Sequence, residues 1–374
     1  MRLLRLLAVA ALTALSVPAQ QPKTPMDSVL LKDWAPDSSL VVPITNIPKA
    51  RYPAIDVHMH VAMRGTNFTG GDTPESIAAW VRVMDAVGVE KIVVLTEATG
   101  PEFDRLADLY LKTHPDRFQV WCGLDTRDFD KPDYPERAAA ELERCYRHGA
   151  RGVGELSDKG SGIMGGMLAA YGNVSKPPRD RRLHLDDPRL DLFWKKCAEL
   201  KIPVNLHVAD HPSAWRPPDN HQERLPRSQI FNQYGADVPS YEELLARRDR
   251  LLARHPETTF IACHFSNQGN DLAALSHAMD RFPGLYLDIS GRDYEIGREP
   301  RAAAKFLERY KDRVMFATDS APGENMYRSW WRLLESADEY MPGPSWWRLY
   351  GLELPDAVLE AIYRGNARRV LNWR

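Results

Sequence analysis

The sequence predicts an α/β protein folded as a closed (β/α)₈ TIM barrel. Two observations predict this fold: eight short apolar segments typical of buried parallel strands recur along the chain, and segments with helical apolar spacing lie between them. A third observation counts against the main alternative, an open doubly wound sheet, because no Gly-x-Gly-x-x-Gly dinucleotide-binding motif follows the first strand.

The chain begins with a segment that has the features of a secretory signal peptide. Residues 1–5 are basic, residues 6–17 are apolar over about half the length needed to cross a bilayer, and small residues allow cleavage after Ala19. An uncleaved anchor is the alternative, but the short apolar run disfavours it. We therefore expect residues 1–19 to be removed and the mature protein to be periplasmic or secreted, without a membrane span.

Residues 20–51 are rich in Pro, Asp and Ser, which predicts an extended N-terminal arm before a barrel domain at residues 52–374. The predicted strands of that domain are residues 54–57, 91–95, 118–123, 150–155, 203–207, 259–264, 285–290 and 314–319. The clearest predicted helices between them are residues 74–87, 135–148, 188–200 and 241–254.

Local signals fix the ends of several predicted helices. Thr73 can cap a helix that has Pro74 at its first position, and Gly88 is suited to end it. His-Pro pairs at His114 and His255 stop two other helices just before a strand. We therefore expect these two histidines to lie at the lower rim of the barrel and to be structural.

Composition excludes some classes of function and partner. The formal net charge is -2 with no long run of either sign, so that nucleic-acid binding through a basic face is not expected. The four cysteines are far apart in sequence and are expected to be buried small hydrophobic residues rather than a disulfide framework or a metal site: Cys122, Cys145, Cys197 and Cys263.

Polar side chains gather where the predicted strands end. His58 and His60 end the first strand, and residues two apart on a strand point to the same side, so that both imidazoles can reach one metal ion. The other strand ends carry further metal-compatible side chains, namely Glu155, His207, His264 and Asp319. Because active sites of such barrels lie at the carboxyl ends of the strands, we expect these side chains to converge.

Three imidazoles and a carboxylate suit Zn²⁺, and Mn²⁺, Co²⁺ or Fe²⁺ accept similar ligands. A bound ion lowers the pKa of its water to about 7. Asp319 could then act as general base and acid, and His264 could polarise a carbonyl.

Asp56 lies two residues before His58. It has two possible roles, orienting a ligand histidine or a buried role inside the barrel.

The chain resembles the amidohydrolase superfamily, in particular the amidohydrolase 2 branch that includes carboxymuconate-semialdehyde-decarboxylase-like enzymes. The resemblance covers roughly residues 52–372 and is carried by Asp-Val-His-Met-His at 56–60, Asn-Leu-His at 205–207, Cys-His-Phe-Ser at 263–266, Ala-Thr-Asp-Ser at 317–320 and Gly-Asn-Ala-Arg-Arg-Val-Leu at 365–371. It implies a barrel of the metal-dependent hydrolase type that acts on a small molecule.

The resemblance also implies roles for the site residues. A divalent ion would be held by His58, His60, His207 and Asp319. His264 would be a second metal ligand in binuclear members and an acid, base or polarising group in mononuclear ones. Glu155 would either bridge two metals or form hydrogen bonds in its loop, and both readings stay open.

Two long connections, residues 157–186 and 209–240, lie at the same rim, and loops of this length are usually functional. We expect His211, Trp215 and Arg292 to contribute to substrate binding.

A homo-oligomer is possible. The leading hypothesis is an exported hydrolase that cleaves an amide, ester or lactone with one or two metal ions. The alternatives are a non-oxidative decarboxylase of a small carboxylic acid and a non-catalytic binding protein.

Overall fold

The computed structural model describes residues 24–34, 36–61, 70–163, 177–223, 232–343 and 347–373. The chain divides into two compact units, Met1–Val41 and Val42–Arg374. The described part of the first unit holds two short 3₁₀ turns, η1 (Pro25–Ser28) and η2 (Leu31–Asp33). The predicted signal peptide at residues 1–19 lies outside the described residues, so that export stays a prediction.

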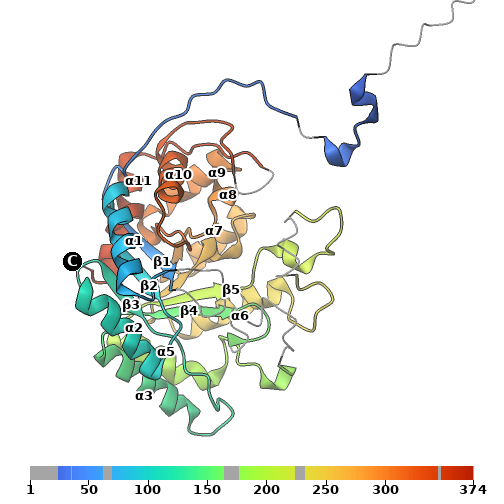
Figure 1. Cartoon of the computed structure of the whole chain (residues 1–374). Coiled ribbons are helices and arrows are strands. Elements are labelled where there is room, and N and C mark those ends of the chain that lie inside the picture. Colours follow the sequence, from blue (N-terminus) through green and yellow to red (C-terminus); the bar gives the residue numbers. More distant parts are fainter. Residues whose placement is uncertain are drawn as a thin grey trace, which may run out of the picture. The chain divides into compact units, whose positions relative to one another are not determined.

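Eight parallel strands form the wall of the barrel in the described residues of the second unit (Figure 1). They are β1 (Ala54–His60), β2 (Val89–Leu95), β3 (Phe118–Trp121), β4 (Val153–Asp158), β5 (Val204–Val208), β6 (Phe260–Ala262), β7 (Leu285–Asp288) and β8 (Val314–Met315). One ladder joins β1, β2 and β3, and a second joins β4 to β8 in chain order. The predicted strand order is confirmed.

Two junctions close these ladders into a barrel. Between β3 and β4, Cys122 N donates to Gly152 O at 3.1 Å. Between β8 and β1, Asp319 N donates to His58 O at 3.0 Å. The second junction also fixes the backbone of Asp319 beside the end of β1, because the bond joins the two chains at that point.

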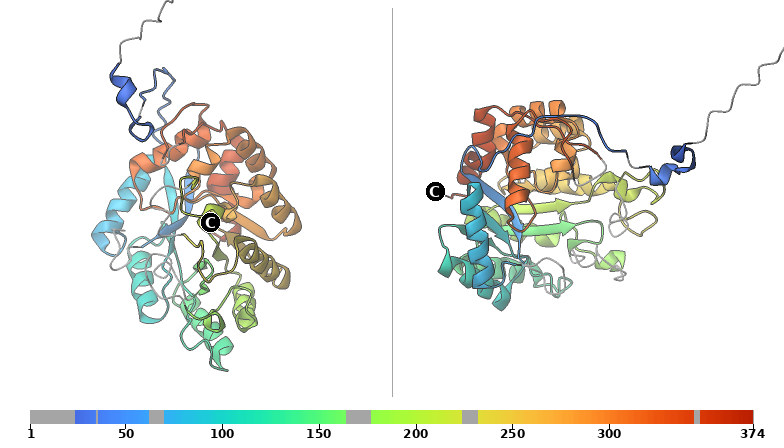
Figure 2. Two further views of the ribbon diagram at one scale, coloured as in Figure 1. Left: turned by 90° about the vertical axis from the view of Figure 1, so that its right-hand side faces the viewer. Right: turned by 45° about the horizontal axis from the view of Figure 1, so that its top comes forward.

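Helices cover the outside of the barrel, one after each strand (Figure 2). They are α1 (Pro74–Val87), α2 (Gly100–Thr113), α3 (Tyr134–Arg147), α5 (Asp191–Leu200), α6 (Tyr241–Arg254), α7 (Leu272–Arg281), α9 (Pro300–Arg309) and α10 (Glu324–Glu335). The predicted ends of α1 are confirmed, since Thr73 Oγ1 accepts from Ser76 N at 3.2 Å and Gly88 ends the helix with φ of +84°.

Shorter helical turns occupy the connections and the C-terminal segment. They are η4 (Arg179–Arg181), η5 (Pro188–Leu190), η6 (Pro212–Trp215), η8 (His264–Asn267), α8 (Asp293–Ile296), η9 (Lys311–Arg313), α11 (Asp356–Glu360), the π-helical η10 (Ala361–Gly365) and α12 (Asn366–Val370).

Apolar side chains form two separate clusters. The larger lies between the strands and the surrounding helices. The smaller contains alternate strand residues such as Ile55 and Val57 together with Trp121 and the C-terminal Trp373. Because these side chains fill one part of the barrel interior, the polar site is confined to the carboxyl ends of the strands.

The segment that precedes β1 is hydrogen-bonded to the barrel unit. Thr45 Oγ1 donates to Asp338 Oδ1 at 2.6 Å, and Ala50 N donates to Val87 O at 3.0 Å. Residues 42–51 are therefore tied to the barrel by their own hydrogen bonds. The boundary of the arm predicted for residues 20–51 stays a prediction.

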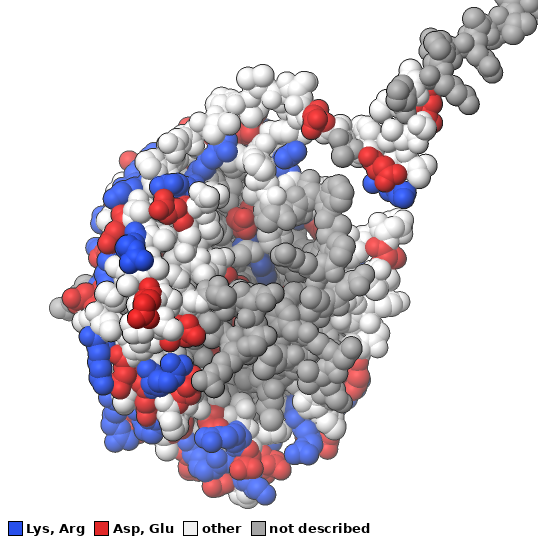
Figure 3. Space-filling view, in the orientation of Figure 1, with Lys and Arg blue, Asp and Glu red and all other residues white. Residues whose placement is uncertain are grey.

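The surface carries charges of both signs. On the face shown in Figure 3, Lys and Arg side chains are interspersed with Asp and Glu. Among the helices of the described ranges, none combines the length and the apolar composition that crossing a bilayer requires.

Candidate metal centre

Strand β1 presents two imidazoles at its carboxyl end. The Nε2 atoms of His58 and His60 lie 3.2 Å apart, so that both rings point to the same place, as their spacing predicts. Two ring nitrogens at this distance are compatible when one carries a proton or when both lone pairs face a shared cation. The pair is therefore a natural starting point for a metal site.

Asp56 does not face the two imidazoles. The pairing of β1 with β2 shifts register between Asp56 and Met59, and such an irregularity interrupts the two-residue alternation of a strand. Asp56 Oδ2 instead accepts from Thr318 Oγ1 at 2.6 Å and from Tyr327 OH at 2.9 Å, and its contact with His58 is to the backbone nitrogen. Asp56 is therefore buried against Thr318 and against Tyr327 of α10 (Glu324–Glu335).

A first donor group surrounds the histidine pair and consists of His58, His60, Asp319 and one oxygen of Glu155. Asp319 Oδ1 lies 3.7 Å from His58 Nε2 and 3.5 Å from His60 Nε2. Glu155 Oε2 lies 3.4 Å from His60 Nε2. Tetrahedral coordination with bonds of about 2.0–2.2 Å places ligand atoms about 3.3–3.6 Å apart, a spacing close to the distances among His58, His60 and Asp319 and between His60 and Glu155.

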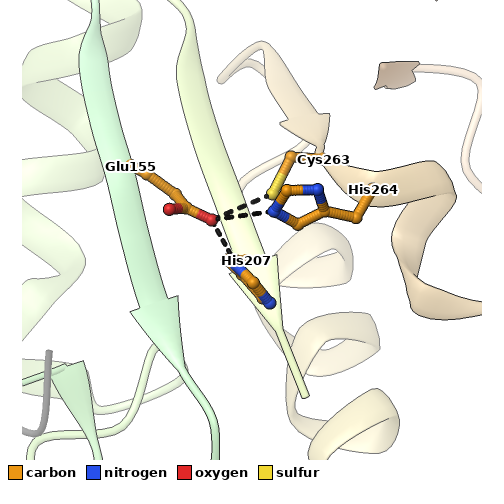
Figure 4. Close-up of side chains that lie close together, drawn as sticks. All are labelled: Glu155, His207, Cys263 and His264. Atoms are coloured by element: carbon orange, nitrogen blue, oxygen red, sulfur yellow. Dashed lines mark hydrogen bonds and ion pairs between the residues drawn. The ribbon is translucent and has the colours of Figure 1, made fainter. Parts of the chain in front are cut away.

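A second donor group surrounds the other oxygen of Glu155 (Figure 4). Glu155 Oε1 is in contact with His207 Nδ1, lies 3.3 Å from His264 Nε2 and lies 3.4 Å from Cys263 Sγ. One ligand atom from each of these four residues can be chosen so that all lie within 4.8 Å of one another. Sequence reasoning named three of the four and assigned Cys263 to the core.

Glu155 lies between the two donor groups and turns one oxygen toward each. His207, which the resemblance placed with His58, His60 and Asp319, contacts Glu155 Oε1, and the ion that it would hold stays a prediction. The preceding Gly154 permits this position of β4 beside β5, because it has φ of +148° and an added Cβ would lie 2.7 Å from Asn205 Cβ. A larger residue at 154 would displace Glu155.

His264 enters the site on a left-handed turn. All four residues of η8 (His264–Asn267) have φ between +51° and +56°, which costs about 1–2 kcal/mol for each residue that is not glycine. Hydrogen bonds hold the turn, since Asn267 Nδ2 donates to Val208 O at 3.1 Å and Arg248 Nη1 donates to Ser266 Oγ at 2.5 Å. The turn brings the imidazole of His264 back toward Glu155.

Comparison with known proteins identifies the family. The amidohydrolase family model, Amidohydro_2, matches residues 55–373. The chain belongs to the amidohydrolase family. Members of this family are enzymes that usually use a divalent metal ion, and the two donor groups of this amidohydrolase form a possible site for one.

Solved structures show the same barrel fold. The amidohydrolase is similar to a 2,6-dihydroxybenzoate decarboxylase from Rhizobium, with 19% identity over 86% of this chain and 99% of that chain and a TM-score of 0.51. A putative amidohydrolase from Staphylococcus aureus has 15% identity over 85% and 99% of the two chains and a TM-score of 0.51. An uncharacterized TIM-barrel protein from Bordetella bronchiseptica has 18% identity over 86% and 98% and a TM-score of 0.50. These likenesses establish the fold and leave the reaction open.

Asp288 supports the first donor group of the amidohydrolase from behind. Its Oδ2 faces His58 Nδ1 at 3.2 Å and accepts from Asn205 Nδ2 at 2.9 Å, while its Oδ1 accepts from Ser290 Oγ at 2.5 Å and from His264 N at 3.2 Å. Burial opposes ionisation, but the neighbouring His58 lowers the pKa of Asp288 to about 2. Asp288 was missed by sequence reasoning, although it ends β7 at the rim.

Two further carboxylates contact ligand histidines and were also missed. Glu97, which follows β2, has Oε1 at 3.4 Å from His60 Nδ1, and burial raises its pKa to about 7. Asp210 Oδ1 lies 3.3 Å from His207 Nε2. The sequence did contain a signal for both residues. Each is an acidic residue that closely follows the end of a strand, where the other site residues also lie.

The second donor group contains an imidazole that is held neutral. Burial and the neighbouring His207 lower the pKa of His264 to about 4. His264 Nδ1 lies 2.9 Å from Ser290 O, to which it donates in the neutral ring. That tautomer turns the lone pair of Nε2 toward Glu155 Oε1. An acceptor nitrogen facing a carboxylate oxygen requires a cation or a proton between them, which supports a metal ion at this position.

Arg292, predicted to bind substrate, is buried and engaged with the protein. Its Nη2 donates to Asn267 Oδ1, and its Nη1 donates to Gly291 O at 2.8 Å. Its guanidinium carbon lies 5.9 Å from the ring centroid of Tyr294. These contacts hold the turn that carries His264, and a contact of Arg292 with substrate stays a prediction.

His211 and Trp215 lie on the long connection after β5. His211 Nδ1 accepts from Ser213 N at 3.2 Å and so caps η6. Trp215 Nε1 donates to Pro239 O at 3.0 Å, and its ring packs against Tyr241 at a centroid distance of 5.8 Å. Both side chains have structural contacts, and a role in substrate binding stays a prediction.

Replacing Asp288 with asparagine is expected to weaken metal binding by about 10–100-fold, because the amide cannot accept all the hydrogen bonds that fix His58 and His264. The unfolding free energy should fall by about 1–3 kcal/mol, since buried donors lose their acceptor. Competition with a chromogenic chelator and urea unfolding measure the two effects. The exposed Asp312→Asn variant is the control, and equal metal affinity in both variants would contradict the assigned support.

Proposed function

We propose that this amidohydrolase is a hydrolase with two divalent metal ions, most simply Zn²⁺, that cleaves an amide, ester or lactone bond of a small molecule. The observation that supports the proposal is the position of Glu155, whose two oxygens face two separate donor groups. A carboxylate in this position can bridge two ions. Hydrolases commonly use such a pair about 3.5–4 Å apart to hold both the attacking and the leaving oxygen.

The donor chemistry fits this assignment. The first group offers two imidazoles and two carboxylate oxygens, and the second offers two imidazoles, a carboxylate oxygen and a thiol. Imidazole and carboxylate ligands accept Zn²⁺ and Mn²⁺, so that the first group does not select strongly between them. When bound, the ions supply an activated water and polarise the oxygen of the scissile bond.

The protein supplies the proton transfers. The side chain of Asp319 is 36% exposed, while that of Glu155 is 4% exposed, so that Asp319 is the carboxylate of the first donor group open to an entering substrate. It can take the proton of the attacking water and give it to the leaving group. Its backbone is fixed by the bond from Asp319 N to His58 O, which keeps the carboxylate beside the ligand histidines.

Decarboxylation is the alternative reaction. It would be favoured by a single metal ion with an arginine facing it. The position of Glu155, which turns one oxygen toward each of two donor groups, favours hydrolysis as the proposal.

Metal stoichiometry and a substrate screen together test the proposed function. Purified protein is expected to contain two equivalents of transition metal, to lose activity on chelation and to regain it when Zn²⁺ or Mn²⁺ is added. The screen would follow proton release from esters and lactones and amine or ammonia release from amides, in parallel with CO₂ release from aromatic and unsaturated acids. Far less than one equivalent of metal would overturn the metal assignment, and CO₂ release without hydrolysis would overturn the reaction.

A further inference from the structure

We propose that the thiol of Cys263 is a ligand of the second metal ion, which makes that position selective for zinc. The proposal rests on the two-metal function above and adds a soft ligand to it. Cys263 Sγ lies 3.4 Å from Glu155 Oε1, the oxygen that also faces His207 and His264. Together these side chains offer two nitrogens, one oxygen and one sulfur, a set that matches the four-coordinate preference of zinc.

The backbone explains how consecutive residues reach one point. Neighbouring residues of a strand normally face opposite sides, so that Cys263 and His264 could not both approach Glu155 from an extended chain. Strand β6 ends at Ala262, Cys263 is still extended with φ of -71°, and His264 begins the left-handed turn with φ of +54°. The turn redirects the second side chain, and both side chains converge on Glu155 (Figure 4).

The surroundings of Cys263 differ from those of the other cysteines. All four are buried and free of disulfides. Cys122, Cys145 and Cys197 belong to the large apolar cluster, whereas neither apolar cluster of the described residues includes Cys263. Its Sγ instead has two oxygen neighbours, with Leu206 O at 3.2 Å and Glu155 Oε1 at 3.4 Å. A fully buried thiol among polar donors is placed for coordination rather than for apolar packing.

Ligation changes the proton balance and the choice of ion. The thiol must lose its proton when it binds the metal, and the proton leaves to solvent. A thiolate is a soft ligand that favours Zn²⁺ and Co²⁺ over Mn²⁺ and Mg²⁺. The two positions should therefore differ, with the first group accepting several divalent ions and the second preferring zinc or cobalt.

Cobalt substitution tests this assignment with a readout other than activity. Metal-free wild-type protein is titrated with Co²⁺, which accepts the same ligands as zinc. We expect two equivalents to bind and a near-ultraviolet sulfur-to-cobalt absorption to grow with one of them. In Cys263→Ser the absorption should disappear. The affinity of the second position for Co²⁺ should fall by at least about 10-fold, because the loss of a direct ligand should cost at least as much as the loss of a hydrogen bond to a ligand. Cys197→Ser, a buried cysteine on α5, should keep the wild-type spectrum.

The outcomes separate this proposal from the proposed function. Two bound equivalents without the sulfur absorption, or an unchanged spectrum in Cys263→Ser, would overturn the thiol ligand and leave the two-metal site standing. Fewer than two equivalents in the wild type would overturn both. If Cys263→Ser does not fold, X-ray absorption on zinc-loaded wild type decides. A sulfur shell at about 2.3 Å supports the ligand, and its absence contradicts it.

Discussion

Replacing Asp319 with asparagine is expected to lower kcat by about 10²- to 10⁴-fold while the protein stays folded. Asparagine has nearly the same shape and can still offer an oxygen, but it cannot take a proton from the attacking water. The main-chain bond from Asp319 N to His58 O does not depend on the side chain, so that the barrel junction should survive the change. The loss is therefore expected in turnover rather than in stability.

Steady-state kinetics at several Zn²⁺ concentrations measure this effect. If Asp319 were a ligand alone, excess metal would restore turnover of the variant. Because we assign it the proton transfers as well, activity should stay low at saturating metal. Asp116→Asn is a suitable control, since Asp116 is exposed and precedes β3 at the opposite end of the barrel. Unchanged kcat in Asp319→Asn would remove this residue from the reaction.

Glutamine in place of Glu155 is expected to reduce the bound metal from two equivalents to one or fewer and to lower kcat by about 10³-fold, equivalent to about 4 kcal/mol of transition-state stabilisation. Each oxygen of Glu155 faces a different donor group, with Oε2 at 3.4 Å from His60 and Oε1 at 3.3 Å from His264. The amide keeps an oxygen for one group and turns a nitrogen that cannot bind metal toward the other.

Elemental analysis after gel filtration measures the metal content of this variant beside the exposed control Glu257→Gln. Circular dichroism and thermal unfolding establish that both variants are folded. Retention of two equivalents by Glu155→Gln would show that Glu155 does not bridge, and it would leave the hydrogen-bonding role that the sequence also allowed. A single equivalent with full hydrolytic activity would contradict the need for a second ion.

The sequence predicted the barrel well because its signals are local. Short apolar strands such as residues 91–95 correspond to β2 (Val89–Leu95), and the Thr73 cap and Gly88 mark the two ends of α1. Strand ends also predicted the site, since parallel strands in a barrel bring their carboxyl ends to one rim. Local periodicity and the closure of the barrel were enough to bring His58, His60 and Glu155 together.

The features of the site that the sequence did not reveal depend on the folded backbone and on contacts between distant segments. The sequence left two roles open for Asp56, and the register shift of β1 against β2 interrupts the alternation that would have turned its side chain toward the histidines. Cys263 was expected to be buried without a disulfide, and it is; its position facing Glu155 beside His264 depends on the left-handed turn at His264, which the sequence did not reveal. Asp288 was overlooked because its importance comes from contacts with His58 and His264, which are far away in sequence.

The sequence by itself determined which strands form and which histidines and carboxylates end them, because hydrophobic periodicity and helix caps act over a few neighbouring residues. The tertiary structure decided how these donors divide into two groups around Glu155. That division depends on the register of β1, on the close approach of Gly154 to Asn205 and on hydrogen bonds that hold a left-handed turn. These interactions join distant segments, and their energies arise only when the barrel has closed.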